Sequence, residues 1–236
     1  MTRPLVVLVT GDPVGGVAAR RGPFSALFAG ALDGVAPAPL LPVEARGSEL
    51  AIPDDVAGVI VTGSASSVTE RAPWMLRTEA LLRDLVRREV PVLGVCFGHQ
   101  LLGAALGGRV ERNPRGREIG TVDVEVLVQD PLLEGLPGRF AANATHMDSV
   151  TVLPPGATLL ARSALEPHAA VRFGAAAWGV QFHPEFDRDV MRGYLEARAE
   201  LVRAEGGDPA RLLAAAGDGE GGRALLRTFA RMLSTR

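Results

Sequence analysis

The sequence predicts an α/β fold in three layers: a mostly parallel central sheet flanked by helices, with a small β-rich antiparallel insert. Residues 4–10, 56–63 and 89–95 are continuous apolar runs rather than alternating ones. Such runs are typical of strands buried on both faces, as in a parallel sheet covered by helices. Helical patterns separate these strands, and short β-rich runs between turn signals occupy 109–182. This order of elements favours α/β layering.

Two helical segments follow the predicted strands. Residues 73–89 begin with Pro73, a residue suited to a first helical turn, and place arginines opposite an apolar face. That face is made by Thr78, Leu81, Leu82, Leu85 and Val86. A second helix is expected directly after Cys96, with an apolar face made by Leu101, Leu102, Ala105 and Leu106.

The remaining elements divide into strands and terminal helices. The β-rich runs are 121–128, 149–153, 169–173 and 176–182. Asp187 is expected to cap a helix over 190–202, and Asp208 precedes a last helical region. In that region Leu225, Leu226, Phe229, Met232 and Leu233 share one face, and 217–222 ("GDGEGG") is expected to be a flexible joint.

The organisation of the chain favours a single domain over 1–236, with a core over about 4–203 and a C-terminal helical extension over about 207–236. There is no internal repeat and no long linker. Hydrophobic residues make up 47% and charged residues 22%, which excludes wholesale disorder.

Charge and composition narrow the class of protein. The net charge of −2 supplies no basic field for nucleic acid or anionic membrane. No apolar stretch is long enough to span a bilayer, and the N-terminal run is too short for a signal peptide. One cysteine forms no intramolecular disulfide. We therefore expect a soluble, cytoplasmic protein.

The chain contains no lysine, since all 25 of its basic residues are arginine. A phosphate loop of the G-x-x-x-x-G-K-[ST] type and a Schiff-base lysine are therefore both excluded.

The only cysteine lies in the pattern Gly94-x-Cys96-x-Gly98, between a predicted strand and a predicted helix. This is the spacing of a nucleophile elbow, with cysteine in the place of serine. There the helix N-terminus lowers the thiol pKa, and the N–H of Phe97 is free to donate to an oxyanion. The alternative is a buried cysteine between two packing glycines, and this stretch alone leaves both interpretations open.

A thiolate nucleophile needs a base that a third group orients. Of the four histidines, His183 is the strongest candidate because Pro184 favours an extended backbone, in which Glu185 projects to the same side. His99 is better explained as a helix-start residue, and His168 is expected at the surface. His146 lies in a predicted polar loop.

A metal site is disfavoured. A structural zinc site needs several cysteines and histidines at short spacings, and one cysteine with scattered histidines does not supply them.

Two motifs together resemble a known family. The segments "GVCFGHQ" (94–100) and "GVQFHPE" (179–185), in that order, resemble the class I, or triad, glutamine amidotransferases. The likeness runs from residue 4 to about residue 203. It implies a flavodoxin-like architecture with Cys96 as nucleophile, His183 as general base and acid, and Glu185 as the residue that orients His183.

The resemblance also implies binding residues. Gln100 occupies the family position that contacts bound glutamine, and 145–150 ("THMDSV") resembles the loop that holds its α-amino and α-carboxylate groups. In that loop the implied residues are Thr145, His146, Met147 and Asp148. The oxyanion donors implied are the N–H of Phe97 and that of Gly63 or Ser64, since Ser64 stands where the family often has a second glycine.

The implied reaction forms a γ-glutamyl thioester on Cys96, releases ammonia, and needs no metal or organic cofactor. The "TGSASSVTERAPW" segment is closer to stand-alone members resembling the amidotransferase domain of GMP synthase and to plant γ-glutamyl peptidases than to anthranilate or carbamoyl-phosphate subunits.

Three interpretations of the function remain. One is a glutaminase that passes ammonia to a separate synthetase, and another is a free-standing hydrolase of γ-glutamyl amides or peptides. The third, disfavoured by the complete Cys–His–Glu set, is a catalytically retired regulatory module. Residues 113–120 are expected to form a solvated arginine-rich turn rather than line the entrance.

Overall fold

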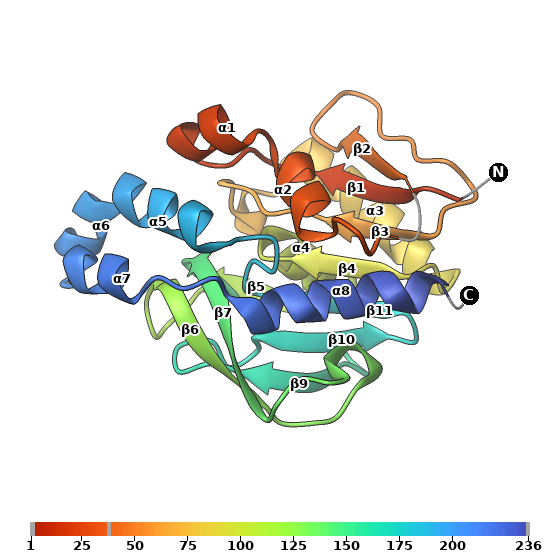
Figure 1. Cartoon of the computed structure of the whole chain (residues 1–236). Helices are drawn as coiled ribbons and strands as arrows, with labels where there is room; N and C mark the ends of the chain where they lie inside the picture. The colour runs from red at the N-terminus through yellow and green to blue at the C-terminus, as the bar shows by residue number, and fades with distance from the viewer. Residues whose placement is uncertain (1–2, 37–38, 235–236) are drawn as a thin grey trace.

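The computed structural model describes residues 3–36 and 39–234. Its main feature is a sheet of nine strands in the order β2-β1-β3-β4-β11-β10-β9-β6-β7, beside a two-stranded sheet of β5 and β8 (Figure 1). The strands are β1 (Leu5–Val9), β2 (Leu40–Glu44), β3 (Gly58–Val61), β4 (Val92–Val95), β5 (Arg109–Arg112), β6 (Glu118–Val126), β7 (Arg139–His146), β8 (Asp148–Val152), β9 (Thr158–Arg162), β10 (Ala170–Gly174) and β11 (Ala177–Val180).

Eight α-helices and two short 3-10 turns are described within those residues. The helices are α1 (Gly15–Arg21), α2 (Phe24–Ala31), α3 (Pro73–Arg87), α4 (Phe97–Ala105), α5 (Arg188–Ala197), α6 (Ala199–Ala204), α7 (Pro209–Ala215) and α8 (Glu220–Ser234). The 3-10 turns are Val68–Glu70 and Pro131–Leu133. No helix in the described part of the chain combines the length and apolarity needed to cross a membrane.

Five strands form a parallel half of the main sheet. The pairs β1–β2, β1–β3, β3–β4 and β4–β11 are all parallel. The predicted strands 4–10, 56–63 and 89–95 correspond to β1, β3 and β4, and each is fully buried. The predicted α/β fold class is therefore confirmed.

The β-rich segment mostly extends this sheet rather than forming a separate unit. Strands β10, β9, β6 and β7 continue it with antiparallel pairings, and only β5 and β8 pair apart from it. Strand β11 is parallel to β4 and antiparallel to β10, so the sheet changes its strand direction there.

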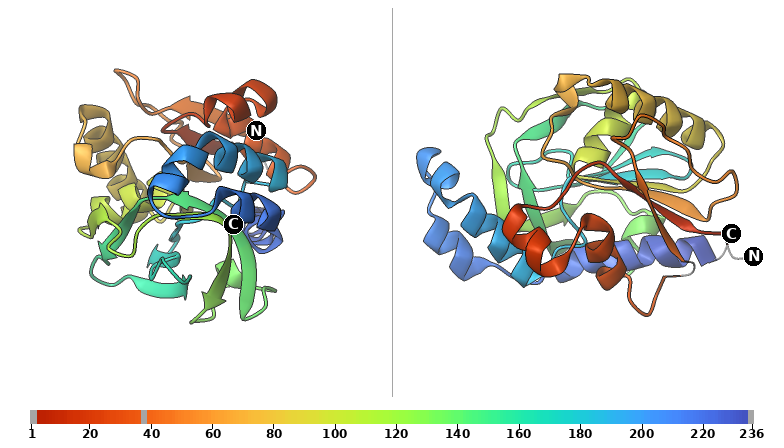
Figure 2. Two further views of the ribbon diagram at one scale, coloured as in Figure 1. Left: turned by 90° about the vertical axis from the view of Figure 1, so that its left-hand side faces the viewer. Right: turned by 90° about the horizontal axis from the view of Figure 1, so that it is seen from above.

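Helices cover both faces of the sheet. Leu5, Val7 and Val9 of β1 share a hydrophobic cluster with residues of α2 and α8. Val6 and Leu8 share another with residues of α3 and α4. Because alternate residues of a strand point to opposite faces, the sheet is the middle layer of three. In the right-hand view of Figure 2, α3 and α8 lie on opposite sides of it.

The C-terminal helix α8 contributes to the first of these clusters. Of its predicted apolar face, Leu225, Leu226, Phe229 and Leu233 are buried, and Met232 packs against the same cluster while partly exposed.

The predicted joint at 217–222 is wrong in its extent. Residues 220–222 form the first turn of α8. Gly217 donates its N–H to Thr121 Oγ1 (2.7 Å) and accepts from Asn143 Nδ2 (3.1 Å). These bonds fix the connection to β6 and β7.

The predicted helix 190–202 is divided in two. Asp187 caps α5 by accepting from the Val190 N–H at 3.0 Å, as expected. The helix ends at Ala197, and Arg198 is both the C-cap of α5 and the N-cap of α6. Asp208 caps α7 through the N–H groups of Ala210 (3.0 Å) and Arg211 (3.2 Å).

Candidate active site

Cys96 lies at a sharp turn between β4 and α4. Its φ of 52° is in the left-handed region, which costs energy for a residue other than glycine. A Cβ on Gly94 would lie 2.5 Å from the Gly98 carbonyl oxygen, and one on Gly98 would lie 2.3 Å from that of Val61. Both positions therefore require glycine, and the turn has the strained, tightly packed form of a nucleophile elbow.

The turn places the thiol at the start of a helix. Phe97 is the first residue of α4, so its N–H has no acceptor within the helix. The partial positive charge of a helix N-terminus favours a thiolate and a developing oxyanion. Cys96 is 6% exposed, and its Sγ lies 3.9 Å from the Thr145 carbonyl oxygen.

His183 and Glu185 reach the same place from the neighbouring strand. Val95 of β4 pairs with Val180 of β11 in parallel register, so the carboxyl ends of the two strands adjoin. His183 Nδ1 lies 2.8 Å from Glu185 Oε1, and both side chains are buried.

The backbone and ring of His183 are also held in place. Its N–H donates to the Asn143 carbonyl of β7 at 2.7 Å. Its ring stacks on Phe186 with centroids 4.1 Å apart. With Nδ1 occupied by Glu185, the second ring nitrogen is left for Cys96.

The charges of Cys96, His183 and Glu185 shift the pKa values of Cys96 and His183 in opposite directions. Burial raises the pKa of the Cys96 thiol, but the charge on His183, a hydrogen bond to its ring and the charge on His146 outweigh burial and lower it. Burial lowers the pKa of His183, but the charges of Glu185 and Cys96 and their hydrogen bonds to the ring outweigh burial, so the pKa is raised. The arrangement therefore favours a thiolate–imidazolium pair.

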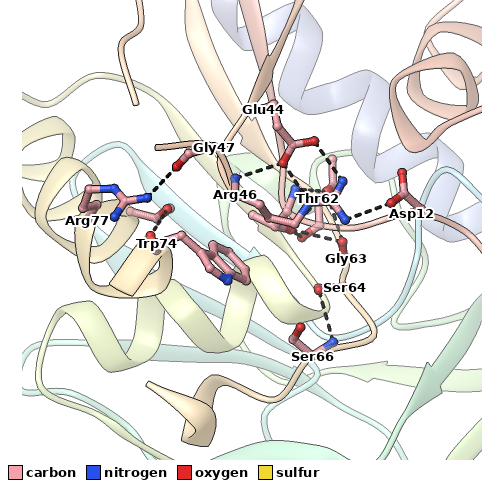
Figure 3. A network of polar contacts seen from close by, with 12 residues as sticks. Asp12, Glu44, Arg46, Gly47, Thr62, Gly63, Ser64, Ser66, Trp74 and Arg77 are labelled. Atoms are coloured by element: carbon pink, nitrogen blue, oxygen red, sulfur yellow. Dashed lines mark hydrogen bonds and ion pairs between the residues drawn. The ribbon is translucent and has the colours of Figure 1, made fainter. Parts of the chain in front are cut away.

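The loop after β3 packs against His183. A Cβ on Gly63 would lie 2.8 Å from His183 Cε1, so the imidazole leaves no room for a side chain there. The Gly63 carbonyl accepts from Thr10 Oγ1 at 3.1 Å. Ser64 Oγ accepts from the Ser66 N–H at 3.2 Å (Figure 3). Ser64 lines the cavity beside Cys96. Gly63 does not line that cavity, and the two predicted donors thus differ in their access to it.

A cavity of about 220 Å³ opens beside Cys96 and Phe97. It is lined by the predicted binding residues Gln100, Thr145, His146, Met147 and Asp148. Gln100 Nε2 donates to the Asp148 carbonyl (2.8 Å) and to Gln181 Oε1 (3.0 Å). The Gln100 side chain therefore also fixes the segment that includes Asp148.

The prediction that His146 lies in a polar loop is wrong, because His146 is the last residue of β7. Only Met147 separates β7 from β8. The His146 ring is buried, with Nε2 3.2 Å from Glu118 Oε2 and Nδ1 3.0 Å from the Asp148 carbonyl oxygen. Strand pairing with β6 brings Glu118 opposite it, a partner 28 residues distant that a local pattern does not indicate.

The other two histidines lie outside this chemistry. His99 is fully buried within α4, as its sequence position suggested, and burial lowers its pKa to about 3. His168 is half-buried rather than at the surface, because its Nδ1 bonds to the Val150 carbonyl oxygen at 2.6 Å.

Two arginines at the cavity were missed by sequence reasoning. Arg117, expected in a solvated turn, lines the cavity and pairs with Glu205 at 2.8 Å, with its side chain 12% exposed. Arg198 lines it from the break between α5 and α6. No sequence pattern marks Arg198, because its position depends on where α5 ends.

Metal ligation finds no support in the described residues, where no group of three or more His, Cys, Asp or Glu side chains is arranged to hold an ion.

Comparison with known proteins decides the family. The family model for "Glutamine amidotransferase class-I" matches residues 36–198. The chain belongs to this family. A GMP synthase (glutamine-hydrolyzing) subunit from Methanothrix thermoacetophila is 35% identical over 65% of this chain and 85% of that one. GMP synthase from Aeropyrum pernix is 40% identical, and the match covers 59% of this chain but 27% of that protein. The chain thus spans about a quarter of that relative.

Solved structures agree on the fold of this amidotransferase. A glutamine amidotransferase from Thermotoga maritima superimposes with a TM-score of 0.76 at 24% identity, covering 100% of this chain and 99% of that one. One from Methylobacillus flagellatus gives 0.74 at 25% identity, covering 100% and 94%.

Proposed function

We propose that this chain hydrolyses the γ-carboxamide of glutamine through a covalent γ-glutamyl thioester on Cys96. The observation that carries the proposal is the buried Cys96 thiol at the elbow, with a lowered pKa, facing an imidazole that Glu185 holds. A lowered thiol pKa, a strained backbone and an oriented base together are features of an activated cysteine nucleophile.

In the first step Cys96 Sγ attacks the amide carbon, and the carbonyl oxygen becomes an oxyanion. The N–H of Phe97 and the amide of the Gly63–Ser64 segment are placed to stabilise it, with Ser64 better exposed to the cavity. His183 then gives its proton to the departing nitrogen, and ammonia leaves.

In the second step His183 takes a proton from water, which attacks the thioester carbon. The C–S bond breaks, glutamate is released, and the Cys96 thiolate is restored. Gln100 and the segment from Thr145 to Asp148 are proposed to hold the glutamyl part, because they line the cavity beside the nucleophile. Every step uses groups of the chain, water and substrate.

The ammonia acceptor belongs to the same proposal. Several relatives are named as one subunit of GMP synthase, which supports a separate synthetase as partner, and co-purification of such a protein would test it. We infer that the amidotransferase domain extends over 1–236, with 207–236 as a helical extension. A free-standing γ-glutamyl hydrolase is the second candidate, favoured by a second cavity at Cys96 described below.

Trapping tests the proposal. An electrophilic glutamine analogue is expected to add one label per chain at Cys96, located by peptide mass spectrometry. Cys96→Ser is expected to abolish both labelling and glutamate release. For a replacement of His183, the matched control is His168→Gln, since His168 lines neither cavity at Cys96. Unchanged glutaminase activity in Cys96→Ser would contradict the mechanism, and an unlabelled, inactive wild type would favour the retired regulatory module.

A further inference from the structure

Cys96 lies where two cavities meet. The first is the 220 Å³ cavity described above, and the second has a volume of about 150 Å³. Ser64, Ala65, Cys96, Thr145 and Arg198 line both. A substrate bound at the nucleophile can therefore extend to two different sides.

The residues that line only one cavity distinguish the two sides. Gln100, Met147 and Asp148 line only the first, and His183 lines only the second. In the proposed reaction the glutamyl part lies against Gln100 and Asp148. The departing nitrogen must meet the ring of His183, which protonates it. The nitrogen and any group attached to it therefore point into the second cavity.

The size of the second cavity exceeds what glutamine requires. Ammonia is about as large as a water molecule, which needs roughly 10–15 Å³ of such space. The volume of about 150 Å³ is several times larger. This cavity has room for a substituted amine as the leaving group.

The charged side chains of the second cavity indicate which amine. Asp12 is already paired with Arg46, whose Nη1 lies 2.8 Å from Asp12 Oδ2 (Figure 3). Arg198 forms no ion pair among residues 3–36 and 39–234, and its buried Nε has no hydrogen-bond partner there. The carboxylate on which its charge acts, that of Glu205, is already paired with Arg117. The uncompensated charge at this cavity is therefore positive.

The guanidinium of Arg198 lies on the side of the second cavity. Its Cζ is 6.0 Å from the centroid of the Tyr194 ring. Tyr194 lines the second cavity and not the first. The backbone of Arg198 is fixed between α5 and α6, so only its side chain must adjust to a ligand.

We propose that the second cavity is a subsite for the leaving amine, and that Arg198 binds a carboxylate carried by that amine. The substrate class is then γ-glutamyl amino acids and short γ-glutamyl peptides. This inference rests on the proposed function, because it uses the same nucleophile and the same base.

The reaction balances without a further reactant. Cys96 Sγ bonds to the γ-carbonyl carbon, the C–N bond breaks, and His183 protonates the nitrogen of the departing amino acid. Water then attacks the thioester, its proton passes to His183, and the C–S bond breaks. The products are glutamate and a free amino acid.

Three substrates and four proteins test the subsite. The substrates are glutamine, γ-glutamylglycine and γ-glutamylglycinamide, and the last of these lacks the carboxylate. The proteins are the wild type, Arg198→Gln, Arg198→Lys and the control Arg203→Gln. Arg203 is exposed on α6 and pairs with Glu200. The readout is kcat/KM for glutamate release by each purified full chain.

We expect the wild type to prefer γ-glutamylglycine over γ-glutamylglycinamide by about ten-fold or more, as for a charge-assisted hydrogen bond to a carboxylate. Arg198→Gln is expected to bring this ratio close to one. Arg198→Lys should retain part of it, because it keeps the charge but loses the bidentate geometry. Arg203→Gln should retain all of it.

Three results would overturn the subsite while leaving the proposed function intact. The wild type could hydrolyse glutamine but neither larger substrate. Arg198→Gln could leave the ratio unchanged. Arg198→Gln could also lower all three activities by one factor, which would assign Arg198 to the glutamyl side. If the wild type cleaves none of the three and the analogue leaves Cys96 unlabelled, the proposed function fails and the subsite fails with it.

Discussion

The charges of two buried histidine–carboxylate groups act on Cys96, and the groups differ in whether the protein leaves a ring nitrogen of the histidine free. At His183, one ring nitrogen bonds to one carboxylate, that of Glu185. At His146, Nε2 bonds to Glu118, while Nδ1 bonds to the Asp148 carbonyl and lies 3.9 Å from Glu166. Both groups raise the pKa of their histidine above its ordinary value.

The difference separates a base from a fixed charge. His183 has a nitrogen directed at the thiol and can exchange a proton with substrate. His146 has both nitrogens occupied by the protein, so it can supply positive charge to Cys96 without transferring a proton. A raised histidine pKa therefore does not distinguish the two histidines, and the proposal of His183 as base depends on the ring nitrogen that the protein leaves for Cys96.

Replacing His183 gives the largest expected effect. His183→Gln removes the proton-transfer group and should lower kcat by about 10⁶-fold, the order of loss found when the histidine of a hydrolase triad is replaced. Single-turnover glutamate release measures it. A comparable loss of kcat in His146→Gln, in protein that is folded by circular dichroism, would break the comparison.

Glu185→Gln comes next, with a loss in kcat of about 10⁴-fold, because the wrong ring nitrogen of His183 is then favoured to carry the proton. Since the carboxylate raises the pKa of His183, its removal should also move the basic limb of the kcat/KM profile to lower pH. A pH–rate profile that keeps the wild-type limb would contradict this role for Glu185.

His146→Gln should act mainly on stability. It leaves Glu118 and Glu166 buried without their cation, and an uncompensated buried charge costs about 3–5 kcal/mol. Urea unfolding measures the free energy. His168→Gln serves as control, because His168 bonds to a backbone carbonyl and to no carboxylate through its ring. A change in the free energy of unfolding below about 1 kcal/mol would show that the charge of His146 does little to stabilise the buried carboxylates of Glu118 and Glu166.

The same network predicts a pH dependence of stability. The folded state raises the pKa of His146. Its contribution to the free energy of unfolding is therefore fully present below the ordinary histidine pKa near 6.5, and it is lost as the pH rises through the pKa of His146 in the folded state. Burial raises the pKa of Glu166, which acts in the same direction from a lower pH. Above about pH 6.5, where the lowered pKa of His99 no longer changes the stability, the free energy of unfolding should thus fall with rising pH, and His146→Gln should flatten this part of the curve. An unchanged slope would oppose this assignment.

The smallest effect is expected at His99. Its burial lowers the pKa to about 3, so the ring is neutral, and it packs at an angle on Phe173 with centroids 5.4 Å apart. His99→Leu should change the free energy of unfolding by less than about 1.5 kcal/mol and keep kcat. A loss of kcat would give His99 a role that its packing does not indicate.

Local patterns were sufficient for part of this site. The Gly-x-Cys-x-Gly turn is recognisable from five residues, although the contact that requires Gly98 is with Val61 of β3. Glu185 is two positions from His183 in an extended segment. The positions of β1, β3 and β4 followed from continuous apolar runs, since strands buried on both faces carry little else.

Other features depend on pairings that no local pattern contains. Glu118 meets His146 only through the register of β6 and β7, and Arg198 reaches the cavity because α5 ends at Ala197. Strand β2 was missed because it is not fully buried and contains Pro42, so it has no apolar run. Composition does not show that β10 pairs with β11, so it does not predict that the antiparallel strands continue the main sheet.

The parallel pairing of β4 with β11 also has a consequence for biosynthesis. Val92 pairs with Ala177, a partner 85 positions later (177 − 92), so the proposed nucleophile emerges from the ribosome long before the proposed base. Contacts of such sequence separation form late in folding. A nascent or unfolded chain therefore carries an ordinary thiol, and the proposed reaction requires that the chain has folded past β11.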